Sequence, residues 1–299
     1  MSKVLVTGGL GQIGSYIVER LAGGHEVTVI DNYSSPAKEV VPNGVKVIRA
    51  DVQDPKIRGI VSKNDVIIHT AAQISVDRST QDPLFDAENN INGTINLLEA
   101  ARSGAVERFV YLSSAAVFGE PVQLPIDELH PQNPLSPYGV SKLSGEKYCM
   151  AYHSTYGLPT VCTRLFNIYS PRQNPNNPYS GVISKFIYRV GAGESPVIFG
   201  DGSQTRDFVS VHDVVDMITI VMEEDDVIGE VYNVGTGTMM SVDDLAKTVL
   251  ELSGKDLKAE YTKPRKGDIN ESYADIGKAK KIGYVPKIEL SEGLRDMIS

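Results

Sequence analysis

The segment that decides the fold is Thr7-Gly8-Gly9-Leu10-Gly11-Gln12-Ile13-Gly14, in which Gly8, Gly11 and Gly14 follow the spacing GxxGxxG. It comes directly after the apolar run Lys3–Thr7, which is typical of a buried parallel strand, and it opens a helical pattern. The first glycine permits a tight turn, the second lets the backbone approach a pyrophosphate, and the third lets the helix pack on the strand. Free N–H groups at the start of the helix attract phosphate. The segment therefore predicts a dinucleotide-binding turn.

An acidic residue follows this turn at the distance that a dinucleotide requires. The strand-like run Glu26–Ile30 ends at Asp31, which lies 17 residues after Gly14. A carboxylate here accepts hydrogen bonds from both ribose hydroxyls and repels a 2′-phosphate. No arginine lies in residues 32–38 to bind such a phosphate. We therefore expect NAD rather than NADP as the cofactor.

Strand-like runs and helical patterns alternate through the first half of the chain, which predicts a Rossmann-type doubly wound parallel sheet over residues 1–166. The expected strands are Lys3–Thr7, Glu26–Ile30, Val45–Arg49, Val66–His69, Arg108–Leu112 and Thr160–Leu165, and the expected helices are Ser15–Leu21, Glu88–Ser103 and Pro137–Tyr156.

The pattern changes after residue 166. Asn167–Gly181 is rich in proline and asparagine and is expected to be a loop. Beyond it we predict a smaller C-terminal α/β substrate domain, residues 167–299. Its helix Val209–Glu224 is expected to pack back on the first domain, and a final helix begins near Glu292.

Composition excludes several classes of protein. The 299 residues are 41% hydrophobic, which is typical of a globular chain. Their formal net charge of −9 is unsuited to nucleic acid as the main partner. No apolar run is long enough to span a bilayer, and the N-terminus shows no signal peptide, so we expect a cytoplasmic protein. The two cysteines, Cys149 and Cys162, form no disulfide framework, and the histidines show no metal-ligand spacing.

The segment Tyr138-Gly139-Val140-Ser141-Lys142 carries the second chemical signal, YxxxK. A separation of four residues places Tyr138 and Lys142 on one helix face, close to a start marked by Ser136 and Pro137. A lysine charge about 6 Å away stabilises a phenolate by about 3 kcal/mol at an effective dielectric constant of 20, which corresponds to about two pH units. We therefore expect Lys142 to lower the pKa of Tyr138 towards neutrality, where a tyrosine serves as a general base.

Ser113 and Ser114 close the fifth strand at the sheet edge that faces this helix. A hydroxyl at that place can pass a proton between a substrate oxygen and Tyr138. The sequence thus predicts Tyr138, Lys142 and Ser114 as the catalytic set.

With these motifs the chain resembles the extended short-chain dehydrogenase/reductases, in particular their nucleotide-sugar branch and the UDP-glucose 4-epimerase group. The resemblance spans nearly the whole chain and rests on residues 7–14 (TGGLGQIG), 31–35 (DNYSS), 69–76 (HTAAQISV), 89–94 (NNINGT), 113–119 (SSAAVFG), 136–142 (SPYGVSK), 164–173 (RLFNIYSPRQ), 200–209 (GDGSQTRDFV) and 264–268 (PRKGD).

The resemblance implies a role for each matching position. The cofactor residues would be Gly8, Gly11, Gln12, Ile13, Gly14, Asp31, Asn32, Asp51, Val52, Ala71, Ala72, Gln73, Asn90, Tyr138 and Lys142. The substrate residues would be Ser75, Ser114, Tyr138, Asn167, Val197, Phe199, Arg206, Arg265, Asp268 and Ser272, with both arginines on the diphosphate. It further implies a homodimer formed through Glu88–Ser103 and Ser141–Tyr156.

The implied activity is 4-epimerisation of a UDP-sugar through a transient 4-keto sugar. Ala115 and Ala116 occupy the positions where the family's dehydratases carry an Asp-Glu pair, which favours an epimerase. Ser272 stands where a bulky residue limits the sugar C2 substituent, so UDP-glucose and UDP-galactose or their N-acetyl counterparts all remain possible substrates. The alternatives are another nucleotide-sugar oxidoreductase, such as a 4-ketoreductase, and a non-catalytic dinucleotide-sensing protein.

Overall fold

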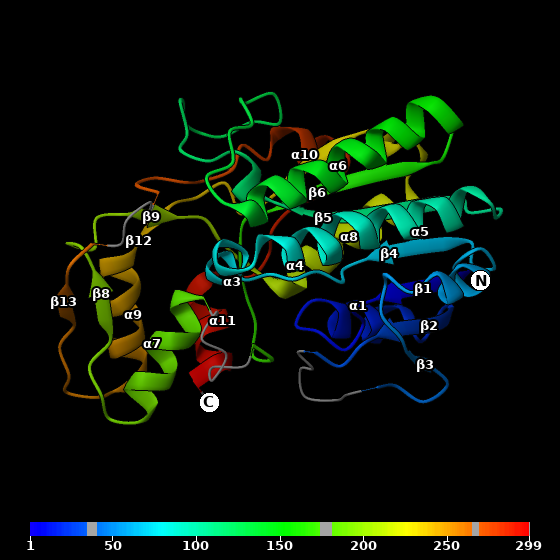
Figure 1. Cartoon of the computed structure of the whole chain (residues 1–299). Helices are drawn as coiled ribbons and strands as arrows, with labels where there is room; N and C mark the ends of the chain where they lie inside the picture. The colour runs from blue at the N-terminus through cyan, green and yellow to red at the C-terminus, as the bar shows by residue number, and fades with distance from the viewer. Residues whose placement is uncertain (35–40, 174–180, 265–268, 299) are drawn as a thin grey trace.

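A seven-stranded parallel sheet forms the centre of the molecule (Figure 1). The computed structural model describes residues 1–34, 41–173, 181–264 and 269–298. The strand order is β11-β6-β5-β4-β1-β2-β3, and every neighbouring pair is parallel. The strands are β1 (Lys3–Thr7), β2 (Glu26–Asp31), β3 (Lys46–Arg49), β4 (Val66–His69), β5 (Arg108–Ser114), β6 (Thr160–Leu165) and β11 (Val231–Val234).

Helices cover both faces of this sheet (Figure 1). Val4 and Val6 of β1 face α1 (Gly14–Leu21) and α8 (Val211–Glu223), whereas Leu5 faces the side of α5 (Gly93–Arg102) and α6 (Pro137–Tyr156). All three β1 side chains are fully buried. Burial on both faces explains why the strands are continuous apolar runs. The prediction of a doubly wound parallel sheet is confirmed.

The direction in which the chain adds strands reverses at β1. The chain passes from β1 to β2 and β3 on one side, then crosses to β4 on the other side and continues to β5 and β6. Ligands of such sheets bind in the crevice beyond the carboxyl ends of the strands at this reversal. The glycine turn after β1 lies at this place.

A smaller lobe stands beside the carboxyl ends of the strands (Figure 1). Phe186, Leu245 and Leu294 belong to its separate apolar core. Its elements are α7 (Val182–Gly191), β8 (Val197–Phe199), β9 (Thr205–Arg206), β12 (Met240–Ser241), α9 (Val242–Ser253), β13 (Glu260–Thr262) and α11 (Leu290–Ile298).

Some elements differ from those expected. Asn167–Tyr169, expected within a loop, forms β7, which pairs with β10 (Phe208–Ser210). As a result, α8 begins at Val211, two residues after the expected start. The helix expected from residue 88 begins as a π-helical turn over residues 88–92 and continues as α5. Two short helices precede it, α3 (Val76–Gln81) and α4 (Pro83–Ala87). A further short helix, α10 (Gly277–Lys281), lies beside β11. Among the described residues, no helix combines the length and apolar character needed to cross a bilayer.

Candidate active site

The glycine turn joins the end of β1 to the start of α1 and leaves no space for a side chain at Gly8 or Gly14. Gly8 has φ +67°, a left-handed conformation that favours glycine, and a Cβ on it would lie 2.8 Å from the backbone of Ala71. A Cβ on Gly14 would overlap the carbonyl oxygen of Gly8, which already accepts a hydrogen bond from Gly11 N at 3.0 Å. The turn therefore presents backbone to a ligand, as a phosphate site requires.

Two polar side chains at the start of α1 fit a pyrophosphate. Gln12 Nε2 and Ser15 Oγ are buried and have no hydrogen-bond partner among the described residues. Buried polar atoms without a partner are rare in folded proteins, and both of these atoms can donate to phosphate oxygens. The residues that would hold the NAD pyrophosphate are Gly8, Gly11, Gln12, Ile13 and Gly14.

Asp31 ends β2 with its carboxylate beside the glycine turn. Its Oδ2 accepts from Leu10 N at 3.0 Å and its Oδ1 accepts from Tyr33 N at 2.7 Å. Asn32 Nδ2 donates to Asp51 Oδ2 at 2.9 Å, so the predicted cofactor residues that follow β2 and β3 lie together. Each carboxylate oxygen retains a lone pair for a ribose hydroxyl, while the negative charge opposes a 2′-phosphate. The geometry fits NAD.

Asn90 fastens the loop after β4 to α6. Its side chain accepts from Gln73 N at 2.8 Å and donates to Gln73 O at 2.9 Å and Ser141 Oγ at 3.0 Å. The buried Asp86 accepts from both Asn90 Nδ2 and Gln73 Nε2. Ser75 caps α3 in the same loop, which also carries Ala71 and Ala72. Asp86 was not predicted from the sequence, although its position four residues before Asn90 in a helical stretch was an available signal.

Tyr138 and Lys142 lie in the first two turns of α6, which Ser136 caps. Lys142 is 5% exposed, and its Nζ donates to Leu112 O of β5 at 2.7 Å. The ammonium lies 5.1 Å from the centre of the Tyr111 ring. The spacing of four residues turns Tyr138, which is half-buried, to the same side of the helix.

The pKa of Tyr138 does not follow the expectation from sequence. Burial raises it above the usual value, hydrogen bonding with Ser114 lowers it, and the charge of Asp86 raises it. Burial also lowers the pKa of Lys142 from 10.5 to about 8. The expectation that Lys142 brings the pKa of Tyr138 towards neutrality is wrong for these residues alone, because desolvation disfavours the phenolate.

Ser114 ends β5 and accepts a hydrogen bond from Ala116 N at 3.2 Å. Ala115 and Ala116 therefore form the first turn of a short 3-10 helix directly after the predicted relay hydroxyl. Neither side chain can exchange a proton, so this strand end offers Ser114 as its proton carrier.

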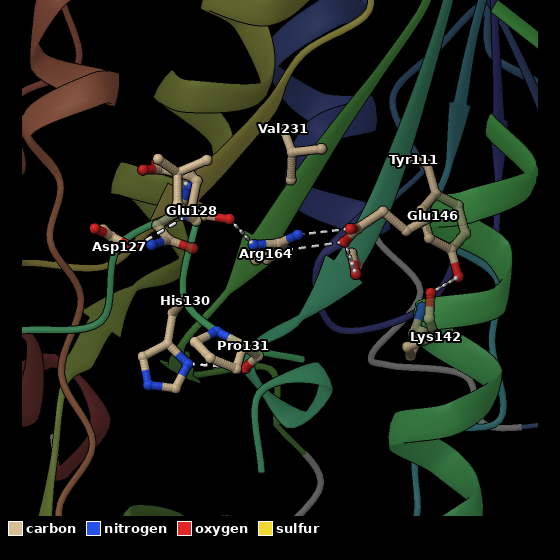
Figure 2. Close-up of polar contacts among 12 residues, drawn as sticks. Tyr111, Asp127, Glu128, His130, Pro131, Lys142, Glu146, Arg164 and Val231 are labelled. Atoms are coloured by element: carbon tan, nitrogen blue, oxygen red, sulfur yellow. Dashed lines mark hydrogen bonds and ion pairs between the residues drawn. The ribbon is translucent and has the colours of Figure 1, made fainter. Parts of the chain in front are cut away.

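A buried ion pair supports α6 one turn beyond Lys142. Glu146 is fully buried and Arg164 of β6 is 2% exposed; Arg164 Nε and Nη2 donate to the two carboxylate oxygens at 3.0 and 2.7 Å. Ser113 Oγ donates to the same carboxylate at 3.1 Å, and Arg164 Nη1 donates to Glu128 O. Figure 2 shows Arg164 between Glu146 and the loop that carries Glu128. This pair was not predicted from the sequence; Glu146, four residues after Lys142, was its available signal.

The predicted substrate residues come from several segments. Asn167 begins β7 and Arg206 ends β9, and Arg206 Nη1 donates to Thr205 O at 2.8 Å. Val197 and Phe199 are half-buried at the two ends of β8, and Ser272 is 7% exposed. Arg265 and Asp268 lie outside the described residues.

His69 is a packed residue at the end of β4. Its ring nitrogens are hydrogen-bonded to Thr7 Oγ1 at 2.8 Å and Thr94 Oγ1 at 3.0 Å, and burial lowers its pKa to about 3. No group of three or more potential metal-ligating side chains occurs within the described ranges. The two cysteines are unlinked and buried.

Comparison with known proteins places this architecture in a family. Residues 4–235 match the NAD dependent epimerase/dehydratase family. The UDP-glucose 4-epimerase of Mycolicibacterium smegmatis is 39% identical over 302 residues, which cover 98% of this chain and 96% of that protein.

Solved structures agree over the same length. The UDP-N-acetylglucosamine 4-epimerase of Methanobrevibacter ruminantium, in complex with UDP-N-acetylmuramic acid, superposes with a TM-score of 0.96 at 37% identity, covering 99% of this chain and 97% of that one. The UDP-glucose 4-epimerase of Thermus thermophilus, in complex with NAD, gives a TM-score of 0.91 at 37% identity, with 99% and 98% covered. The resemblance drawn from the motifs is confirmed, and so is NAD as the cofactor of this architecture. The chain belongs to the NAD-dependent epimerase/dehydratase family.

Proposed function

We propose that this protein is a 4-epimerase of UDP-sugars, which inverts the configuration at C4 through a transient 4-keto sugar. The observation that carries the proposal is the strand end of β5 facing the start of α6. Tyr138 and Lys142 share one helix face, Lys142 is hydrogen-bonded to Leu112 O of the strand that Ser114 ends, and the two positions after Ser114 are alanines. This arrangement holds one acid/base system, which epimerisation needs, and lacks the second base that the family's dehydratases use.

Tyr138 would take the proton of the 4-hydroxyl as C4 is oxidised, and Ser114 would relay it. When bound, NAD supplies the hydride acceptor for C4 and returns the hydride later. Since burial raises the pKa of Tyr138, the phenolate needs a nearby positive charge, and Lys142 in its ammonium form provides one. Leu112 O holds that ammonium in place.

Inversion requires the nucleotide to stay anchored while the sugar turns. Asn167, Arg206 and Arg265 would hold the diphosphate. The two arginines suit this role because guanidinium groups bind phosphate through two parallel hydrogen bonds. Val197 and Phe199 would bracket the uracil. The sugar would meet fewer fixed contacts, so that its opposite face can be presented for reduction.

Ser272 would set the substituent accepted at C2. A serine leaves space where a larger side chain would exclude an N-acetyl group, so UDP-N-acetylglucosamine is a candidate substrate beside UDP-glucose. The similarity to epimerases of both kinds supports testing the two substrates together.

The test is incubation of the purified protein with UDP-glucose and, separately, with UDP-N-acetylglucosamine, without added cofactor, followed by proton NMR. NAD is regenerated in each turnover, so it should remain bound to the purified protein. We therefore expect the C4 epimer to appear without added cofactor. The faster substrate identifies the C2 group. Tyr138→Phe is the control, with an expected loss of about 10²- to 10⁴-fold in rate and with NAD still retained.

The contrary outcomes separate the alternatives. Turnover of a 4-keto sugar only after NADH or NADPH is added would make the protein a 4-ketoreductase. Retained dinucleotide without turnover of any nucleotide sugar would make it a dinucleotide-binding protein.

A further inference from the structure

The carboxylate of Asp207 is the most completely coordinated acidic group beside the predicted substrate residues. Asp207 lies between β9 and β10 and is fully buried. Its Oδ1 accepts from Thr236 N at 2.8 Å and Thr236 Oγ1 at 2.7 Å, and its Oδ2 accepts from Gly237 N at 3.0 Å and Ala274 N at 3.2 Å. All four partners are donors, so the cradle is built for two oxygen acceptors.

The chain around this cradle is shaped to reach the carboxylate. A Cβ on Gly235 would lie 2.5 Å from Asp207 Oδ2 and 3.0 Å from Ala274 Cβ. Gly237 has φ +75°, which turns its N–H towards the same oxygen. An asparagine at position 207 would place an NH₂ group against N–H donors, so it cannot replace the carboxylate in this cradle.

The backbone of Asp207 is fixed as well. Its carbonyl oxygen accepts from Asn167 N at 3.0 Å and from Asn167 Nδ2 at 3.3 Å. One residue thus joins β7, the end of β9, the turn after β11, and the segment that carries Ser272. Arg206 precedes Asp207 directly, and Ser272 lies two residues before Ala274.

We propose that Asp207 is the positioning residue of the UDP-sugar subsite, which sets the places of Arg206, Asn167 and the Ser272 segment relative to one another. This inference rests on the proposed function, because those three positions are its substrate residues. Asp207 touches neither the reacting C4 nor NAD in this scheme. Its loss should therefore weaken nucleotide binding more than it slows the chemical step.

The test compares Asp207→Asn with a matched control, Asp213→Asn. Asp213 is also a buried carboxylate that accepts from backbone N–H groups, those of Lys287 at 2.8 Å and Ile288 at 3.3 Å, but it fastens the C-terminal segment to α8. Both variants lose stability if the carboxylates are structural. Only Asp207→Asn should raise the KM for the UDP-sugar and the Kd for UDP by about tenfold, with kcat changed less than about threefold and NAD content unchanged.

The readouts separate failure of this inference from failure of the proposed function. Calorimetry with UDP alone measures Kd even if the wild type epimerises no sugar, so the inference stays testable in that case. Equal Kd and KM for the two variants, after both are shown to be folded, would refute it. If Asp207→Asn does not fold, Thr236→Val removes one of the four donors and should still raise the Kd for UDP by about two- to threefold; an unchanged Kd would again refute the inference.

Discussion

At the residue scale, the fold shifts the pKa of Lys142 towards neutral pH. Burial lowers its pKa from 10.5 to about 8, while the nearby charge of Asp86 opposes this shift. The unfolded chain therefore holds one proton more than the folded chain between pH 8 and pH 10.5, so folding stability rises with pH in this window. The contribution of Lys142 to folding stability is fully present above pH 10.5 and is lost as the pH falls through about 8.

We expect the free energy of unfolding of the wild type, relative to that of Lys142→Met, to increase by about 1.4 kcal/mol per pH unit in this window. Urea unfolding of both proteins at several pH values checks it, since the other titrating groups are common to the pair. Parallel stability curves would show that Lys142 keeps an ordinary pKa.

The residue scale also shows where sequence reasoning ends. The spacing GxxGxxG, Asp31 and the YxxxK pattern predicted side chains that the fold does bring to one sheet edge. For the protein residues alone, the direction of the Tyr138 pKa shift was wrong, because a spacing reports which groups are neighbours and not how much solvent they lose. Glu146 and Asp207 were missed for a similar reason: their partners lie 18 and at least 29 residues away in the chain.

At the scale of elements, α6 carries the acid/base pair and must hold its register on β5 and β6. Tyr138, Lys142 and Glu146 follow one another at four-residue steps, and the pair of Glu146 with Arg164 fixes the third step to β6. Glu146→Gln leaves the Arg164 charge buried without its counter-charge, so we expect a loss of about 3 kcal/mol in the free energy of unfolding.

The double variant Glu146→Leu/Arg164→Met removes both charges and should recover most of that loss, since an apolar pair of similar volume often matches a buried ion pair in stability. Urea unfolding of the single and double variants measures both effects. A single variant that loses less than about 1 kcal/mol would show that the pair does not secure α6.

The first six strands of the central sheet and the capped helix α6 were predictable elements, whereas β7, β10 and β11 were not. Their existence depends on pairing with distant segments, as when β11 adds to β6. A local pattern carries no signal for such pairing, so the central sheet gains a strand that lies beyond the predicted boundary at residue 166. The division of the chain into a cofactor and a substrate domain stays a prediction.

At the scale of the whole molecule, α3, α4 and α6 contact one another and form a surface on which four large apolar side chains are exposed. Val76 is 47% exposed, Leu84 76%, Val140 48% and Tyr148 41%. Large exposed apolar patches on soluble proteins mark sites of interaction with other proteins. The surface includes part of the helix pair that the family resemblance implies for a dimer, so we propose that two copies of the chain associate through it.

This proposal predicts a sedimenting mass of twice 32.5 kDa at micromolar concentration. Tyr148→Glu should shift the population towards the monomer, because it places a charge in an apolar interface. Tyr188→Glu is the matched control: Tyr188 is 52% exposed on α7 in the smaller lobe, and its replacement should leave the mass unchanged. A wild-type protein that sediments as a monomer, or a control that dissociates as readily as Tyr148→Glu, would contradict an interface at α6. Because α6 also carries Tyr138 and Lys142, dissociation by Tyr148→Glu should lower the epimerisation rate together with the mass, whereas the control should retain both.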